Sequence, residues 1–463
     1  MRFVSLDAAL RRVLLFGLPA AVLVLPVLLL ETDARACGGC FHPPPGENPS
    51  VVTDHRMILS ISKQQSTLWD QIKYTGSPSS FAWVLPVSGT VEVGISADSV
   101  FGNLDALTAT SILEPPKNCP RQPQSSSGGC SSVTDAQSSL AGGADRNSGV
   151  EVTKRDVVGP YETVQLKATD AGALEKWLSQ NGFVVTPDVQ PIVNQYVTEK
   201  FDFLALKLLP GKGVQDMRPV RVTTHGANAV LPLRMVSAGT GSMVGITLWV
   251  LGEGRYEPQN FPTFRIKDDE LVWDWAQNRS NYMELRAQKT QAASARAWDL
   301  ESSQSPNPQQ FRSLFGSSSP SPIDYQADDK AGKSAEQVRS EDLTALFEGK
   351  TIETTRVTRL RADLAHAALS EDLVMLASAD QGVLPNVRQA TKESGQPMCF
   401  VYTEGRTSGM APRDEAAQRM EGDERFGCTT SSRSRGGAWL GAAAAALALA
   451  IARARCRRAG KQC

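Results

Sequence analysis

The segment ARACGGCFHPPPG at residues 34–46 holds the densest set of reactive side chains in the sequence, with Cys37, Cys40 and His42 close together. This spacing could attach haem, form a redox pair or supply half of a zinc site. Haem attachment needs the histidine directly after the second cysteine, where Phe41 stands instead. The three prolines that follow cannot form the helix that lowers a thiol pKa in redox motifs, and the other histidines are too isolated to complete a zinc site. A structural disulfide is the interpretation that remains.

The chain has eight cysteines, of which only Cys456 and Cys463 follow an apolar segment near the C-terminus. The other six form an even set, which is typical of disulfide-bonded proteins in oxidising compartments. Sequence alone leaves their connectivity open. Proximity along the chain favours the pairs Cys37 with Cys40, Cys119 with Cys130, and Cys399 with Cys428.

Motifs of known enzyme classes are absent. No Gly-x-Ser-x-Gly elbow, His-Glu-x-x-His helix or phosphate-binding loop is present, so no catalytic residue is assigned and we expect neither a cofactor nor a metal site. The four histidines could still join a serine and an aspartate through the fold. The acidic residues 268–270 lack the ligand spacing of a calcium loop and predict a charged turn. The Arg-rich TRLRADL at 358–364 is interpreted as a solvated strand face rather than an anion site.

Two tryptophans are the remaining candidates for binding. Trp273 and Trp275 alternate in ELVWDWAQN, which would place both on one face of a strand. An exposed aromatic pair can stack on sugar rings or on a partner's side chains. Burial of both rings in or beside the core is the competing interpretation.

The N-terminal residues 1–36 have the features of an export signal. Three arginines precede the uncharged run 13–30, and the Ala-Arg-Ala at 34–36 is the small-x-small pattern of a cleavage site, which would make Cys37 the first mature residue. An uncleaved anchor is the alternative, because about 18 apolar residues can just span a bilayer. Lipidation of Cys37 is less favoured, since Ala34 stands where lipoprotein signals carry a leucine-like residue.

The C-terminal segment 429–463 combines a polar spacer, a short apolar helix at 438–452 and a cluster of arginines. Arginines next to a membrane helix stay on its cytoplasmic side. The helix would therefore place all residues before it on the outer side of the inner membrane. The layout resembles the tripartite sorting signals of bacterial surface proteins, especially the Gly-Gly and myxobacterial types. A plain C-terminal anchor that stays attached is the alternative.

The pattern of apolar residues predicts an α+β fold with a largely antiparallel sheet and a few packed helices, flanked by the signal segment and the C-terminal membrane helix. In FAWVLPV, Val84 and Leu85 are both apolar, which predicts a central strand covered on both faces. Ser96 is the expected N-cap of a following helix. Four apolar stretches between residues 201 and 254 are separated by Gly or Pro and predict an antiparallel meander.

The domain organisation follows from shifts in composition. A Ser- and Gly-rich stretch at 117–149 predicts a surface loop, and a second polar stretch predicts a linker or an insertion. The expected order is an α+β domain at 37–300, the linker at 301–340, and a C-terminal part of the same domain at 341–428.

Several motifs, in order along the chain, resemble one bacterial family. They are ACGGC, STLWDQIKYTG, FAWVLPV, GPYETVQL, FLALKLLPG, MRPVRV, WVLGEGRYEPQNF and VTRLRADL. Together they are similar to the exported proteins catalogued as domain of unknown function 2330. The resemblance implies a secreted or surface protein with a single extended domain, and it implies no activity.

Charge and composition narrow the class of function. The chain carries 48 basic and 49 acidic residues and has no basic stripe. Its charge pattern therefore gives no reason to expect that it binds nucleic acid. We therefore expect an exported envelope protein, in the periplasm or on the cell surface, that is anchored or sorted by its C-terminal segment and contacts envelope or surface components through a non-catalytic binding or scaffolding domain. The alternative is an exported hydrolase that acts on peptide or glycan.

The mature protein is expected to begin at Cys37, because Ala34 and Ala36 fit the small pockets of a signal peptidase. N-terminal sequencing of the purified envelope protein tests this expectation. Recovery of intact residues upstream of Val13 would instead show an uncleaved N-terminal anchor.

Overall fold

The structure is a computed structural model, and it describes residues 40–41, 51–75, 82–120, 152–167, 171–181, 187, 189–212, 216–238, 240–316, 333–403 and 406–427. These residues form two compact units, each built from several stretches of the chain. Unit 1 takes residues up to Ser111, Ser138–Ile266 and Leu285–Asn386. Unit 2 takes Ile112–Gln137, Lys267–Glu284 and the chain from Val387 onward.

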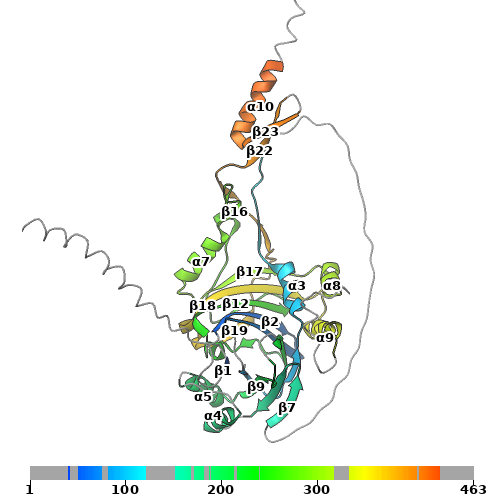
Figure 1. Cartoon of the computed structure of the whole chain (residues 1–463), viewed down its shortest axis with the longest axis vertical. Coiled ribbons are helices and arrows are strands. Elements are labelled where there is room, and N and C mark those ends of the chain that lie inside the picture. The colour runs from blue at the N-terminus through cyan, green and yellow to red at the C-terminus, as the bar shows by residue number, and fades with distance from the viewer. Residues whose placement is uncertain are drawn as a thin grey trace, which may run out of the picture. The chain divides into compact units, whose positions relative to one another are not determined.

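An eight-stranded mixed sheet is the frame of unit 1 (Figure 1). Strand β12 lies near its middle, parallel to β2 and antiparallel to β18, and the pair β14 and β17 is also parallel. Across the sheet the order is β14 (Thr263–Phe264), β17 (Trp298–Gln304), β18 (Arg356–Ala365), β12 (Thr240–Gly252), β2 (Val51–Ile61), β3 (Gln65–Thr75), β10 (Val220–His225) and β5 (Glu92–Ile95).

A five-stranded antiparallel sheet is the second layer of unit 1. Val84 packs in a cluster with helices α4 (Ala171–Gln180) and α5 (Gln190–Thr198), whereas Leu85 packs in the core that contains Trp69. Both side chains are buried, which confirms the expected central strand covered on both faces. The order is β1 (Cys40–Phe41), β4 (Ala82–Val87), β9 (Asp202–Leu208), β8 (Tyr161–Leu166) and β7 (Val152–Val158).

Smaller elements complete unit 1. A three-stranded sheet has the order β11 (Val230–Leu231), β19 (Leu373–Ala377) and β13 (Tyr256–Pro258), and the short helix α6 (Leu233–Ser237) follows β11. Helices α3 (Asp98–Thr108), α8 (Pro308–Gly316) and α9 (Ala335–Phe347) lie together beside the eight-stranded sheet (Figure 1). Helix α7 (Tyr282–Ala292), of which all but the first three residues belong to unit 1, precedes β17 along the chain.

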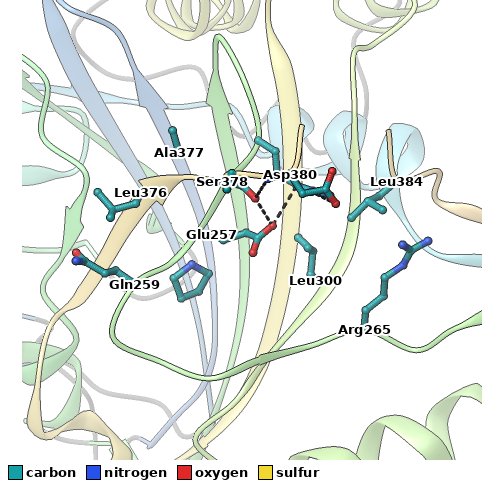
Figure 2. Close-up of a pocket in the computed structure, with 12 residues that line it drawn as sticks. Glu257, Gln259, Arg265, Leu300, Leu376, Ala377, Ser378, Asp380 and Leu384 are labelled. Atoms are coloured by element: carbon teal, nitrogen blue, oxygen red, sulfur yellow. Dashed lines mark hydrogen bonds and ion pairs between the residues drawn. The ribbon is translucent and has the colours of Figure 1, made fainter. Parts of the chain in front are cut away.

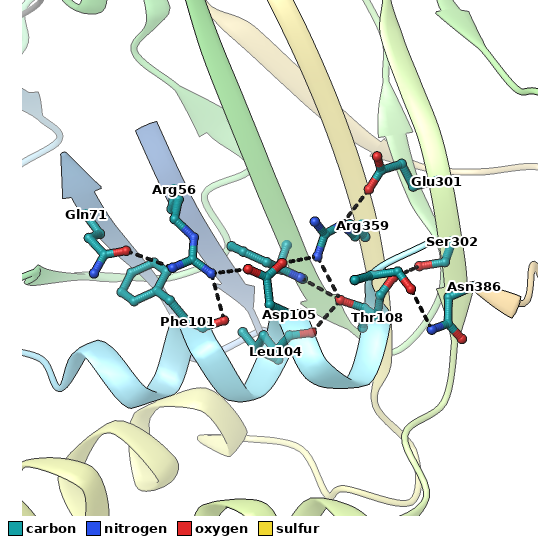
Figure 3. Close-up of polar contacts among 12 residues, drawn as sticks. Arg56, Gln71, Phe101, Leu104, Asp105, Thr108, Glu301, Ser302, Arg359 and Asn386 are labelled. Atoms are coloured by element: carbon teal, nitrogen blue, oxygen red, sulfur yellow. Dashed lines mark hydrogen bonds and ion pairs between the residues drawn. The ribbon is translucent and has the colours of Figure 1, made fainter. Parts of the chain in front are cut away.

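Two arginines on β2 and β18, the strands on either side of β12, hold α3 in place (Figure 3). The guanidinium carbons of Arg56 and Arg359 lie 5.4 Å and 5.0 Å from the ring centre of the fully buried Trp249. Asp105 of α3 forms an ion pair with both arginines, and Arg359 also pairs with the buried Glu301 of β17. The expectation that TRLRADL is a solvated strand face is therefore wrong for Arg359, which is only 5% exposed.

A single carboxylate fixes the start of α3 and the position of α9. Asp342 of α9 is fully buried and accepts hydrogen bonds from the Ser96 hydroxyl and the Ala97 backbone N–H, at 2.7 and 2.9 Å. It also accepts from the Trp69 indole and from Arg221. Ala97 is the N-cap residue and no side chain caps the first turn, so the expected capping by Ser96 is wrong; the Ser96 hydroxyl donates to Asp342 instead.

In the described part of the chain, unit 2 includes small two- and three-stranded sheets and a helix that follows the last strand. Strand β15 (Val272–Asp274) pairs with β16 (Arg279–Ser280) and β21 (Lys392–Ser394), and β6 (Ser111–Leu113) pairs with β20 (Val387–Gln389). The hairpin β22 (Met398–Thr403) and β23 (Arg406–Pro412) is followed directly by α10 (Arg413–Gly427). A disulfide joins Cys119 to Cys399, with the Cα atoms 5.5 Å apart.

The disulfide corrects the pairing expected from proximity. Cys119 bonds to Cys399 across 280 residues, so neither the pair Cys119 with Cys130 nor the pair Cys399 with Cys428 forms. The side chain of Cys399 points into a buried cluster with Val401, Ala411 and Ala416, and Cys119 packs against the same cluster. Cys37, Cys130 and Cys428 lie outside the described residues, and Cys40 begins β1.

Two further expectations differ from the structure. The stretches between residues 201 and 254 do not form a meander: β9 lies in the five-stranded sheet, β10 and β12 lie apart in the eight-stranded sheet, and LRMVS forms α6. The linker expected at 301–340 is shorter, since β17 continues to Gln304 with Ser302 and Ser303 fully buried, and α8 and α9 occupy both ends.

None of the helices in the described ranges combines the length and hydropathy needed to cross a bilayer. The signal segment 1–36 and the apolar segment 438–452 both lie outside those ranges. The observed fold class is α+β with mixed, mostly antiparallel sheets.

We expect reduction of the disulfide to weaken unit 2 selectively. Replacing Cys119 and Cys399 together by serine removes a cross-link of a kind that contributes on the order of 2–4 kcal/mol, since it limits the unfolded ensemble. Hydrogen exchange in β22 and β23 should then accelerate, while exchange in β12 of unit 1 stays unchanged. A cross-linked peptide pair in non-reducing maps checks the bond itself, and unchanged exchange in the double variant would contradict its structural role.

Candidate functional site

The candidate site is an open cleft of about 490 Å³ in unit 1 (Figure 2). Its residues come from β13 and the segment that follows it, from Leu300 of β17, and from the end of β19 with the turn beyond it. The volume lies within the range of roughly 300–1,000 Å³ that is typical of small-molecule sites. Segments far apart in the sequence therefore meet at one hollow, because the three-stranded sheet places β13 beside β19.

A buried arginine organises the polar side of the cleft. Arg255 is 2% exposed, and its Nη2 lies 2.5 Å from Asp380 Oδ2. Its Nε lies 3.1 Å from Glu257 Oε1, close enough for an ion pair although the N–H is not aligned for a hydrogen bond. Since a buried guanidinium without counter-charge is costly, the two carboxylates are held here by the need to neutralise Arg255.

The serine of the cleft is also committed to internal contacts. The Ser378 hydroxyl donates to Glu257 Oε1 at 2.8 Å and accepts from the backbone N–H of Asp380 at 3.2 Å. The backbone N–H of Gly382, together with Arg255, lowers the pKa of Asp380. Asp380 therefore stays ionised and is unsuited to act as a general acid at neutral pH.

Other groups of the cleft are free to meet a ligand. Arg265 is exposed and makes no hydrogen bond or ion pair with the described part of the chain, and the side-chain amide of Gln259 is likewise free there. Leu376 is 49% exposed, and together with the more deeply buried Leu300 and Leu384 it supplies the apolar lining of the cleft. Figure 2 shows Leu376 and Gln259 on one side and Arg265 and Leu384 on the other. The cleft thus offers the exposed guanidinium of Arg265, whose charge also lowers the pKa of Asp380, beside apolar surface.

The histidines do not complete a catalytic triad among the described residues. Nδ1 of His55 contacts both carboxylate oxygens of Asp70 at 3.0 Å, but its Nε2 is buried and has no hydrogen-bond partner. His55 is only 1% exposed, so a substrate cannot reach it. His366 Nε2 contacts the backbone oxygen of Ser237, and His225 is exposed at the end of β10. His42 lies outside the described residues.

A second polar pair has the composition of a serine–lysine dyad. The Lys350 amine lies 2.5 Å from the Ser60 hydroxyl, and burial lowers the pKa of Lys350 to about 8. The Ser60 hydroxyl donates to the backbone oxygen of Leu346 at 2.9 Å and is 2% exposed. The pair therefore packs α9 against β2 and does not present a nucleophile.

The two tryptophans of the sequence prediction meet in unit 2. The rings of Trp273 and Trp275 lie 6.2 Å apart in an edge-to-face arrangement, and both residues are half-buried. Trp275 donates its indole N–H to Glu393 at 2.8 Å, and the Lys117 amine lies 5.7 Å from its ring centre. The pair is thus neither fully exposed nor buried in the core, and the ring of Trp275 is already occupied by a cation. A binding role for it stays a prediction.

The residues that form the cleft were not singled out by sequence analysis. Arg255 and Glu257 stand in WVLGEGRYEPQNF, which contributed only to the family resemblance. This motif could have indicated the site, because charged residues directly after a long apolar strand mark the strand's end, where polar side chains gather. The acidic residues 268–270 form a short 3₁₀ turn, as expected. No cluster of three or more metal-ligating side chains occurs in the described ranges.

Comparison with known proteins places the chain in a family. Residues 32–317 match the protein family described as "Uncharacterized protein conserved in bacteria (DUF2330)". The chain belongs to the DUF2330 family. No curated protein matches it significantly in sequence.

Similar solved structures are those of baculovirus P35. A mutated P35 after caspase cleavage is 9% identical over 44% of this chain and 66% of that chain, with a TM-score of 0.25. P35 in a complex with caspase-8 is 10% identical over 45% of this chain and 65% of that chain, with a TM-score of 0.21. The DUF2330 chain thus spans about two thirds of these P35 chains, and the likeness is too low to define a common fold.

Lys350 should make stability depend on pH in the alkaline range. Its pKa is about 8 in the folded protein and near 10.5 when exposed, so the unfolded chain binds more protons between these values. The free energy of unfolding should therefore rise from pH 8 to pH 10.5, relative to a Lys350→Met variant that lacks the titrating group. Urea denaturation at several pH values measures the difference, and parallel pH profiles for the two proteins would contradict it.

Proposed function

We propose that this DUF2330 protein is an exported envelope protein that binds a small amphipathic carboxylate in the cleft of unit 1 without transforming it chemically. The observation that carries the proposal is that some polar groups of the cleft are held by internal contacts while other groups are available to a ligand. Glu257, Asp380 and Ser378 are tied to Arg255 or to each other, whereas Arg265 is exposed without an ion pair or hydrogen bond in the described part of the chain, and leucines supply the apolar lining. Groups of the first kind would be needed for catalysis, and groups of the second kind suffice for recognition.

The ligand class follows from these free groups. An unpaired guanidinium favours a carboxylate, with which it can form two parallel charge-assisted hydrogen bonds. Leu376, Leu300 and Leu384 offer apolar area to an adjoining hydrocarbon group. A short peptide with a free C-terminus and a leucine-like last residue combines both features.

Placement outside the cytoplasm is supported by two independent features. The sequence begins with a pattern typical of an export signal, and the disulfide between Cys119 and Cys399 is of a kind that persists in oxidising compartments. Retention or sorting by the segment 438–452 completes the proposal. The alternative, a hydrolase of peptide or glycan, finds its best support in the His55–Asp70 pair, whose burial counts against it.

Isothermal titration with acetyl-Leu-Leu, which carries a free carboxylate, tests the proposal against the matching C-terminal amide. We expect the acid to bind more tightly than the amide, and Arg265→Gln to reduce its affinity about tenfold, because one charge-assisted interaction is lost. Leu376→Asp should abolish binding, while Val157→Asp, at a similarly exposed site on β7, should leave it unchanged. Equal affinities for acid and amide, or release of free leucine, would contradict the proposal.

A further inference from the structure

The hairpin of unit 2 has one face that is apolar and uncovered within the described structure. Met398, Phe400 and Met410 are each 51% exposed, and Phe400 lies directly opposite Met410 across the two strands. Tyr402 adds a fourth side chain and a second ring, with its centre 6.5 Å from that of Phe400. We call these four side chains the hairpin face.

The other face of the same hairpin is closed. Cys399, Val401 and Ala411 alternate with the exposed residues and are buried against α10, where Ala416 is fully buried. The disulfide to Cys119 fixes the start of β22. The two-residue periodicity of a strand would normally place polar side chains on the open face, so the apolar residues there lack a folding role.

The position of the hairpin along the chain indicates what covers this face. Helix α10 ends at Gly427, and the apolar segment 438–452 with its arginine cluster begins shortly afterwards. Extended chain spans at most about 3.3–3.6 Å per residue, so residues 428–437 hold the end of α10 within roughly 35 Å of that segment. We propose that the hairpin face docks on the outer surface of the lipid bilayer in which the segment 438–452 is inserted. This inference rests on the membrane retention included in the proposed function.

The chemistry of the face suits the neutral part of the lipid interface. The four side chains carry no charge, and aromatic rings with a polar tip, such as Tyr402, favour the boundary between headgroups and acyl chains. The hairpin has unpaired backbone groups at its edges, which limits it to shallow insertion. The exposed Arg406 of β23 and the exposed Asp414 and Glu415 in the first turn of α10 give no net attraction to anionic lipid, so docking should be insensitive to salt.

The short chain between α10 and the segment 438–452 makes a weak contact of the hairpin face with the bilayer effective. A few half-buried side chains would give only marginal affinity for a membrane from free solution. A short linker converts the second contact into an intramolecular step at an effective concentration in the millimolar range. The same hairpin without the anchored segment would therefore leave the surface.

Docking can be measured by comparing the oxidation rates of methionines inside and outside the hairpin face of the same molecule. The mature chain with its tail is reconstituted in vesicles of zwitterionic phosphatidylcholine and treated with chloramine-T, a charged oxidant that stays in water. Met243 and Met283, which are 45% and 54% exposed, are internal controls for Met398 and Met410. We expect the two hairpin methionines to oxidise about tenfold more slowly than the two controls, at low and at high salt.

A matched pair of variants separates docking from other causes. Phe400→Glu adds a charge to an exposed position of the hairpin face and should restore the oxidation of Met398 and Met410 to the rate of the controls. Val157→Glu, at a similarly exposed position of unit 1, should retain the protection. If Phe400→Glu unfolds the hairpin, as hydrogen exchange would show, Phe400→Gln serves in its place.

Each remaining outcome overturns a different claim. If the chain fails to float with the vesicles, then membrane retention by the segment 438–452 is wrong, and docking falls with it. If the chain floats and all four methionines oxidise equally, only docking is wrong. Protection that persists in lipid-free amphipol would show that the tail or a second copy covers the face, and would also overturn docking.

Discussion

The packing of Trp249 between two arginines is the interaction on which the larger unit depends. Trp249 lies in the strand at the middle of the sheet, and Arg56 and Arg359 on its two neighbours bring positive charge to both sides of the ring. That charge is tolerable because Asp105 of α3 pairs with both arginines and Glu301 with one. Helix α3 is thus bound to the sheet by charge as well as by the apolar contact of Phe101 with Trp249.

Sequence patterns anticipated the parts of the fold that depend on local periodicity. The helix at 98–108 and the doubly covered strand with Val84 and Leu85 follow from apolar spacing alone. The parallel pairing of β2 with β12 did not follow, because nothing in either strand encodes a partner nearly two hundred residues away. For the same reason the start of α3 was misassigned, since the Ser96 hydroxyl donates to Asp342 of the distant helix α9 instead of capping α3.

The candidate site was hidden from the sequence for a related reason. Arg255, Ser378 and Asp380 stand in two short turns separated by more than a hundred residues, and only the pairing of β13 with β19 brings them together. Proximity along the chain misled in the case of the cysteines as well. Cys119 and Cys399 meet because β22 turns its odd-numbered residues toward α10, a fact of three-dimensional packing that spacing cannot reveal.

The same disulfide changes what a broken backbone means for this protein. Because Cys119 and Cys399 are bonded, the chain between them is a covalently closed ring that contains most of the larger unit. One hydrolysed peptide bond inside that ring opens it but leaves every fragment attached, so the C-terminal residues stay linked to the N-terminal ones. A break after Cys399 has the opposite effect and releases everything downstream of the cut. A protease can therefore separate this chain from its C-terminal tail with one cut there, but not with one cut inside the ring.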